Sequence, residues 1–140
     1  MAAANDERRP PNKRAAAAPK RAGGFRVKRV YEPAVESDGL RVLVDRLWPR
    51  CLTKEKARID LWLKELAPSD ALRRLVHSDP AKWPEFITAY GRELQQEPAL
   101  TAAARLGERL RRQPITLLYG ARNETRNNAV ALKHWLERKK

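Results

Sequence analysis

The sequence predicts a small α/β domain with a short, mostly parallel sheet of about three or four strands flanked by helices. Three observations lead to this prediction. Residues 25–31, 40–45 and 115–119 have strand-like apolar patterns. A long stretch with helical apolar spacing separates the second of these segments from the third, as in the helical crossovers that connect parallel strands. The 140 residues provide room for one such domain.

The three predicted strands differ in how apolar they are. Residues 25–31 alternate apolar and basic side chains, a pattern typical of a half-buried strand. Residues 40–45 follow a turn signal at Ser37-Asp38-Gly39 and are more apolar than the first strand. Residues 115–119 are apolar almost throughout and lie between a proline and a glycine, which predicts a central strand covered on both faces.

Two helices are expected soon after the second strand. Thr53 is a helix-capping residue, and apolar residues follow it at helical spacing at Ile59, Trp62, Leu63 and Leu66. Pro68 and Ser69 restart the chain, and a shorter helix follows with its apolar residues at Leu72, Leu75 and Val76.

Three further helices complete the predicted domain. Asp79 and Pro80 indicate an N-cap and a first-turn proline, and the apolar stripe that follows belongs to the core: Trp83, Phe86, Ile87, Tyr90 and Leu94. A helix entered at Pro98 turns Leu100, Ala103, Leu106 and Leu110 inward. The last helix, from about Thr125 to Arg138, buries Ala129, Leu132 and Trp135 or Leu136.

The first 24 residues differ in composition from the rest of the chain. They contain no aromatic and no branched apolar residue, so burial cannot offset the conformational entropy of ordering them. The sequence therefore predicts a disordered, basic, Ala/Pro-rich tail over residues 1–24 and one α/β domain over residues 25–140. The alternative to a solubilising tail is a segment that clings to nucleic acid or acidic surfaces.

Composition excludes several classes of protein. The apolar runs are only a few residues long, far short of the roughly 20 that span a bilayer, and no secretory signal is recognisable. A single Cys cannot form an internal disulfide, and with two His there is no cluster to hold zinc. We therefore expect a cytoplasmic protein with no membrane association, no metal and no cofactor. Its formal charge of +13 is compatible with a nucleic-acid partner or with a basic solvated surface.

Polar and cationic residues follow the second and third predicted strands. Because ligands of open α/β sheets gather beyond the carboxyl ends of the strands, these residues are candidates for an anion site. Arginine forks and the N-terminus of the last helix suit a phosphate or a carboxylate. The candidate binding residues are Arg46, Arg50, Tyr119, Arg122, Asn127 and Asn128. The alternative is structural: Arg46 and Arg50 pair with Asp38, Asp45 or Asp60, and Asn127 or Asn128 caps the helix.

Two residues are weak candidates for catalysis. His77, at a junction between helices, is of a type that serves as a general base or binds phosphate, although such a residue more often donates to a backbone carbonyl. Cys51 follows Arg50, whose charge favours a thiolate, but no His is adjacent in the sequence. His134 is expected on a solvated helix face. Whether the protein is an enzyme stays open at this point.

The chain resembles the YeaO-like proteins, a family defined as a domain of unknown function. The resemblance covers nearly all of residues 25–140 and is carried by residues 44–50 (VDRLWPR), 62–69 (WLKELAPS), 77–83 (HSDPAKW), 116–119 (TLLY) and 127–130 (NNAV). It implies a small bacterial cytoplasmic α/β domain and carries over no catalytic residue. The family pattern has Gly at position 51, which weakens a catalytic role for Cys51. More distant relatives have an acidic residue and a Cys-His-Arg run near Arg122 and Asn127-Asn128.

Three functions are compatible with these patterns. The first is a domain that binds a small phosphate- or carboxylate-bearing ligand at the carboxyl ends of its strands, with or without catalysis. The second is a basic protein associated with nucleic acid, which the charge of the tail and of the domain favours. The third is a regulatory or interaction domain without catalysis. The oligomeric state is left open.

Overall fold

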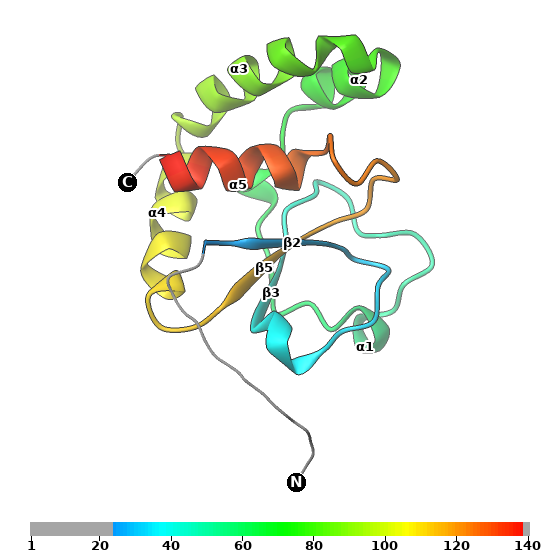
Figure 1. The fold of residues 1–140 in the computed structure, drawn as a ribbon, viewed down its shortest axis with the longest axis vertical. Helices are drawn as coiled ribbons and strands as arrows, with labels where there is room; N and C mark the ends of the chain where they lie inside the picture. Colours follow the sequence, from blue (N-terminus) through cyan, green and yellow to red (C-terminus); the bar gives the residue numbers. More distant parts are fainter. Residues whose placement is uncertain (1–23, 139–140) are drawn as a thin grey trace, which may run out of the picture.

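The computed structural model describes residues 24–138 and confirms the predicted fold class. The predicted tail lies almost wholly outside the described residues. Within them, one sheet of parallel strands runs in the order β2-β5-β3-β4 (Figure 1). The strands are β2 (Arg26–Arg29), β3 (Leu40–Leu43), β4 (Leu61–Trp62) and β5 (Ile115–Tyr119). As predicted, β5 is central, and all five of its residues are buried.

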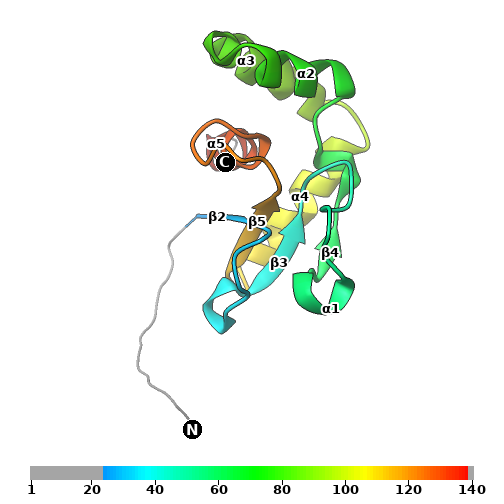
Figure 2. The same ribbon diagram turned by 90° about the vertical axis from the view of Figure 1, so that its right-hand side faces the viewer.

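The helices of the described residues are α1 (Lys54–Ala57), α2 (Asp70–Ser78), α3 (Trp83–Leu94), α4 (Ala99–Leu110) and α5 (Asn128–Arg138). Three 3-10 turns accompany them: η1 (Glu36–Asp38), η2 (Lys64–Leu66) and η3 (Pro80–Lys82). Figure 2 shows the arrows of β3 and β5 pointing toward the part of the molecule where α2, α3 and α5 lie. The carboxyl ends of these strands therefore face the side of the sheet where α2, α3 and α5 lie.

The two faces of the sheet have different surroundings. One face packs against α3, α4 and α5 in the main core, where Phe86, Leu106 and Leu132 meet Val42 and residues 115, 117 and 119. On the other face, a smaller cluster forms around Val30, Leu43 and Leu118, with Trp48, Leu52, Ile59 and Trp62 packed against it. The apolar stripe predicted for α3 is confirmed as core.

The helix predicted from Thr53 through Leu66 is wrong beyond Ala57. Thr53 does cap a helix, accepting a hydrogen bond from the Lys56 N–H, but α1 ends at Arg58 in a left-handed conformation (φ 51°, ψ 44°). Leu61 and Trp62 then pair with β3 as an edge strand. Leu61 packs in the main core and Trp62 in the smaller cluster, as a strand with alternating faces requires.

The last helix begins at Asn128, later than predicted. The side chain of Asn123 accepts hydrogen bonds from the N–H groups of Thr125 and Arg126 at 3.0 and 2.9 Å. Such side-chain bonds hold the preceding residues in a turn that competes with helix. Ala129 and Leu132 are buried, as predicted. The Asp79 cap likewise begins the 3-10 turn η3, which precedes α3.

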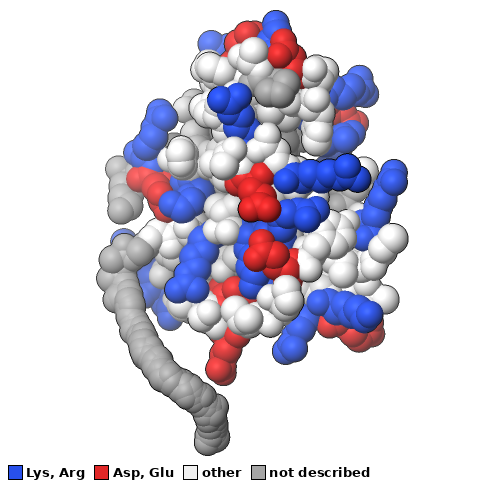
Figure 3. Space-filling model, turned by 45° about the vertical axis from the view of Figure 1, so that its right-hand side comes forward, with Lys and Arg blue, Asp and Glu red and all other residues white. Residues whose placement is uncertain are grey.

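Charges of both signs are interspersed on the surface. In Figure 3, Lys and Arg side chains alternate with Asp and Glu across the face shown, and they do not gather into one broad basic patch. The same view shows opposite charges side by side, as on an ordinary solvated surface.

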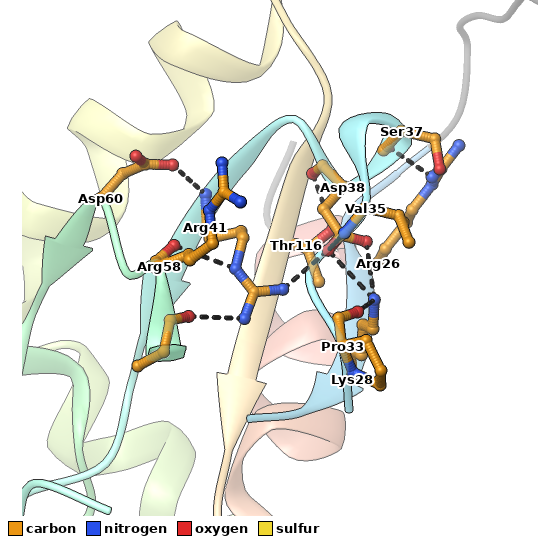
Figure 4. Close-up of polar contacts among 11 residues, drawn as sticks. Arg26, Lys28, Pro33, Val35, Ser37, Asp38, Arg41, Arg58, Asp60 and Thr116 are labelled. Carbon is orange, nitrogen blue, oxygen red and sulfur yellow. Dashed lines mark hydrogen bonds and ion pairs between the residues drawn. The ribbon is translucent and has the colours of Figure 1, made fainter. Parts of the chain in front are cut away.

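A buried polar network lies on the second face of the sheet, near the amino ends of the strands (Figure 4). Asp38 and Arg41 are each only 4% exposed and are joined by a hydrogen-bonded ion pair at 2.7 Å. Arg41 also donates to the carbonyls of Ala57 and Arg58, and Lys28 donates to both Asp38 oxygens. The network fastens η1, α1 and β2 to the start of β3.

Candidate functional site

A cleft of about 620 Å³ lies at the carboxyl edge of the sheet. Its walls come from the segment after β3, the segment after β5 and the helix α2. It is lined by Arg46, Arg50, Arg122, Asn127 and Asn128 of the predicted site, together with His77. The structure therefore brings together side chains from two segments that are more than 70 positions apart in the sequence.

Two of the predicted residues are not part of the cleft lining. Tyr119 is the last residue of β5, is 3% exposed and packs in the main core. Burial raises the pKa of its hydroxyl, with Glu124 and Glu32 adding to the effect. Cys51 is exposed and lies just past the lining residue Arg50.

Asp45 is half-buried, whereas the arginines of the lining are exposed, so Asp45 forms the floor of the cleft and the arginines its rim. Its Oδ2 accepts a hydrogen bond from the Gly120 N–H at 2.8 Å, and its Oδ1 accepts one from Nδ2 of Asn128 at 3.0 Å. The same Asn128 amide donates to the Val44 carbonyl at 3.0 Å. The ends of β3, β5 and the start of α5 are thus fastened at one carboxylate.

Burial raises the pKa of Asp45, because desolvation disfavours its charged form. The hydrogen bonds from Asn128 and Gly120, and the charges of His77 and Arg73, act in the opposite direction without cancelling the effect. Asp45 is therefore a partly desolvated carboxylate set among cations.

The Asp45 carboxyl carbon, followed by NMR against pH, is expected to titrate with a pKa above the ordinary value of 3.8. Asn128→Ala should raise this pKa further, since it removes a hydrogen bond that favours the ionised form. Asp38 is the internal control: its pKa lies below 3.8 and should not respond to the Asn128 change. An Asp45 pKa at or below 3.8 would contradict the assignment.

Several arginines line the same cleft as this carboxylate. Arg46 and Arg73 share Asp70 at 3.8 and 3.5 Å, with about half of each side chain exposed. Such surface pairs contribute little stability, typically about 0–1 kcal/mol. The partner of Arg46 is thus Asp70 and not one of the aspartates considered from the sequence. Arg50 and Arg122 are exposed at the cleft.

The segments that carry these arginines are held by side-chain bonds to their backbone. Arg29 donates to the carbonyls of Ala121 and Gly120 at 2.9 and 3.3 Å. Tyr31 donates to the carbonyl of Arg50 at 3.0 Å and stacks under the Arg29 guanidinium, 5.0 Å from the ring centre. The cleft walls are therefore preorganised from β2 and the residues just after it.

The two asparagines act as structural residues within the cleft. Asn127 caps α5, because its Oδ1 accepts from the Val130 N–H and its Nδ2 donates to the Asn123 carbonyl, both at 2.9 Å. Asn128 holds Asp45, as described above. The capping alternative considered from the sequence is confirmed for Asn127.

His77 and Cys51 have different surroundings. His77 lies in the last turn of α2, lines the cleft and interacts electrostatically with Asp45. Cys51 has a left-handed backbone (φ 64°), which a side chain disfavours and glycine adopts freely. This conformation explains why glycine suits that position in the YeaO-like pattern.

Cys51→Gly is expected to stabilise the fold by about 0.5–1 kcal/mol, because it relieves the left-handed strain at an exposed position. Urea unfolding measures the change. Cys51→Ala is the matched control, since it removes the thiol but keeps Cβ, and it should leave the stability nearly unchanged. An equal gain from both variants would show that the thiol, and not the backbone, is responsible.

Sequence reasoning missed Asp45 as the floor of the cleft and Arg73 and Arg126 as lining residues. Asp45 was accessible to the same argument as Arg46, since it directly follows the second strand. Arg73 was not, because its position depends on how α2 packs over the sheet edge. No group of three or more His, Cys, Asp or Glu within residues 24–138 could hold a metal ion. In the same range, no helix is long and apolar enough to cross a membrane.

The fold and the cleft define a class: a small parallel α/β domain with an arginine-rimmed cleft at the carboxyl edge of its sheet. The chain belongs to the YeaO-like family, and residues 24–140 match the family model described as the inactive DUF488-N3 subclade.

Two relatives show how far the similarity extends. The chain is 45% identical to the uncharacterized protein YeaO of Escherichia coli (strain K12) over 109 residues, which are 78% of this chain and 93% of that protein. It is 39% identical to the uncharacterized protein Rv3073c of Mycobacterium tuberculosis (strain ATCC 25618 / H37Rv) over 107 residues, 76% of this chain and 88% of that protein. No solved structure gives a significant match.

Proposed function

We propose that this is a cytoplasmic protein that binds a small phosphate- or carboxylate-bearing ligand in the cleft, without catalysing a reaction on it. One observation carries the proposal: five arginines from three segments line the same cleft, namely Arg46, Arg50, Arg73, Arg122 and Arg126. Guanidinium groups that converge on a concave site are suited to bidentate binding of phosphate and carboxylate. The volume of the cleft is typical of small-molecule sites.

The family description and the residues of the cleft favour binding of the ligand without catalysis. The family description names the subclade inactive. The hydrogen-bond donors of the cleft floor are engaged in holding the walls together: Asn127 caps α5, and Asn128 and the Gly120 N–H donate to Asp45. His77 and Asp45 are lining residues of types that often serve as general bases, and among the described residues neither forms a hydrogen bond to a hydroxyl or thiol side chain.

A thermal-shift screen of the full chain is the first test. The probes are inorganic phosphate, ribose 5-phosphate, AMP and a short oligonucleotide, each at two salt concentrations. A probe at ~100 times its Kd stabilises the native state by about 2.7 kcal/mol, which moves the midpoint visibly. A shift with a small anion that survives added salt supports the proposal. A salt-sensitive shift with the oligonucleotide alone would contradict it and favour a nucleic-acid partner.

Arginine variants then locate the site. Arg50→Ala and Arg122→Ala are each expected to weaken binding of the tightest small probe by about 1.5–3 kcal/mol, the cost of losing a charged hydrogen bond. Titration calorimetry measures the loss. Arg105→Ala is the matched control, because Arg105 is an exposed arginine on α4 outside the cleft lining. If all three variants bind equally well, the ligand does not occupy this cleft.

A further inference from the structure

The cleft offers different chemistry at its floor and at its rim. Asp45 is at the floor, and each of its carboxylate oxygens accepts one hydrogen bond from the protein, from Gly120 or from Asn128. A carboxylate oxygen has two acceptor positions, so each oxygen retains one for a ligand. The floor therefore presents a negatively charged acceptor, whereas the rim presents arginines.

Asn128 strengthens this difference. Its amide nitrogen donates to both the Val44 carbonyl and Oδ1 of Asp45, which uses both of its N–H groups. What the side chain has left is its carbonyl oxygen, another acceptor. Asn128 also lines the cleft. Two residues of the floor, Asp45 and Asn128, therefore present acceptors that a ligand can satisfy only with hydrogen-bond donors.

A simple anion fits this arrangement poorly. An inorganic phosphate or a small carboxylate carries negative charge on every side, and like charges in a partly desolvated site repel each other. The cleft of about 620 Å³ is also much larger than such an ion. A ligand that satisfies both regions has its acid group at one end and O–H or N–H donors at the other.

Resting on the proposed function, we infer that the ligand is a phosphorylated sugar compound, either a sugar phosphate or a nucleotide. Its phosphate meets the arginines of the rim, and its hydroxyl groups donate to Asp45 and to the carbonyl oxygen of Asn128. Sugar hydroxyls suit this role because a hydroxyl donates to a carboxylate without bringing a negative charge to it. Asp45 then acts as the residue that selects donor-bearing phosphates over bare anions.

Calorimetry on the wild-type chain tests the inference without any substitution. Methyl phosphate, a phosphate ester with no sugar hydroxyls, is compared with ribose 5-phosphate and AMP. At least one of the two sugar compounds is expected to bind about 10-fold or more tightly than methyl phosphate, as one added hydrogen bond to a charged group would produce. The compound that binds more tightly, ribose 5-phosphate or AMP, shows whether the ligand is a sugar phosphate or a nucleotide. Equal affinities for all three would overturn the inference while leaving the anion site intact.

Asp45→Asn provides the second measurement. This variant should lose most of the preference for the sugar compound, whereas its affinity for methyl phosphate stays the same or rises, because a negative charge has been removed. An unchanged preference in a folded variant would overturn the role of Asp45. If no probe binds the wild type, and the arginine variants behave as the wild type does, it is the proposed function itself that fails.

Discussion

Asp38→Ala is expected to destabilise the protein by about 3–5 kcal/mol, the cost of removing one member of a buried ion pair. Asp38 accepts from Arg41, from Lys28 and from the Val35 N–H, and it is almost inaccessible to solvent. Without its carboxylate, the buried Arg41 guanidinium retains only backbone carbonyls as partners within residues 24–138. Chemical denaturation, monitored by tryptophan fluorescence and by circular dichroism, measures the loss.

Glu85→Ala is the matched control for this substitution. Glu85 also belongs to an ion pair, with Lys82 at 3.9 Å, but the side chains of Lys82 and Glu85 are 45% and 66% exposed. Its removal should change the stability by less than about 1 kcal/mol. Similar losses of stability for the two variants would mean that burial does not increase the contribution of the Asp38 ion pair.

The pH dependence of stability gives the same prediction a second measurement. Burial alone would raise the pKa of Asp38, but its hydrogen bonds from Val35, Lys28 and Arg41 outweigh burial and hold the pKa below 3.8. A lowered pKa in the native state means that the carboxylate contributes its full stability above pH 3.8. This contribution is lost as the pH falls from there toward the native pKa. Asp38→Ala should flatten the stability curve in that window.

The parts of the fold that local sequence determines were predictable. The central strand Ile115–Tyr119 has an apolar run between Pro114 and Gly120, so its extent follows from a few adjacent residues. The edge strand β4 was not predictable in this way. It has two residues, and its extended conformation depends on pairing with Val42 and Leu43, which lie far from it in the sequence. The apolar residues at Ile59, Trp62, Leu63 and Leu66 have helical spacing, although they do not form one helix in the structure.

The candidate site likewise has parts that the sequence predicts and parts that depend on tertiary packing. Because β3 and β5 are parallel neighbours, the segments that follow them meet at one edge, and this rule brings Arg46 and Arg122 to the same cleft. The third wall depends on α2, which contributes Arg73 and His77 only through its packing over that edge. The sequence pattern also did not predict the orientation of individual side chains. Tyr119 packs in the core at the end of its strand, and Asn127 caps its own helix.

A side chain at position 39 is expected to cost about as much as the loss of Asp38. Gly39 joins η1 to β3 with φ 65° and ψ −136°, a conformation that residues with Cβ rarely adopt and that costs about 1–3 kcal/mol. A Cβ there would also lie only 2.3 Å from the carbonyl oxygen of Pro114. That same oxygen accepts the Leu40 N–H at 2.9 Å, the bond that starts the pairing of β3 with β5.

Gly39→Ala should therefore destabilise the protein by about 3 kcal/mol or more, because backbone strain and a backbone clash add together. Gly107→Ala is the matched control with the opposite sign. Gly107 lies in α4 with nothing within 4 Å of the place where a Cβ would stand, so alanine there should stabilise the helix by about 0.5–1 kcal/mol. Denaturant midpoints of the two variants measure both effects. A small loss for Gly39→Ala would mean that the turn can rearrange without disturbing the register of the sheet, and hence that the carboxyl-edge cleft does not depend on it.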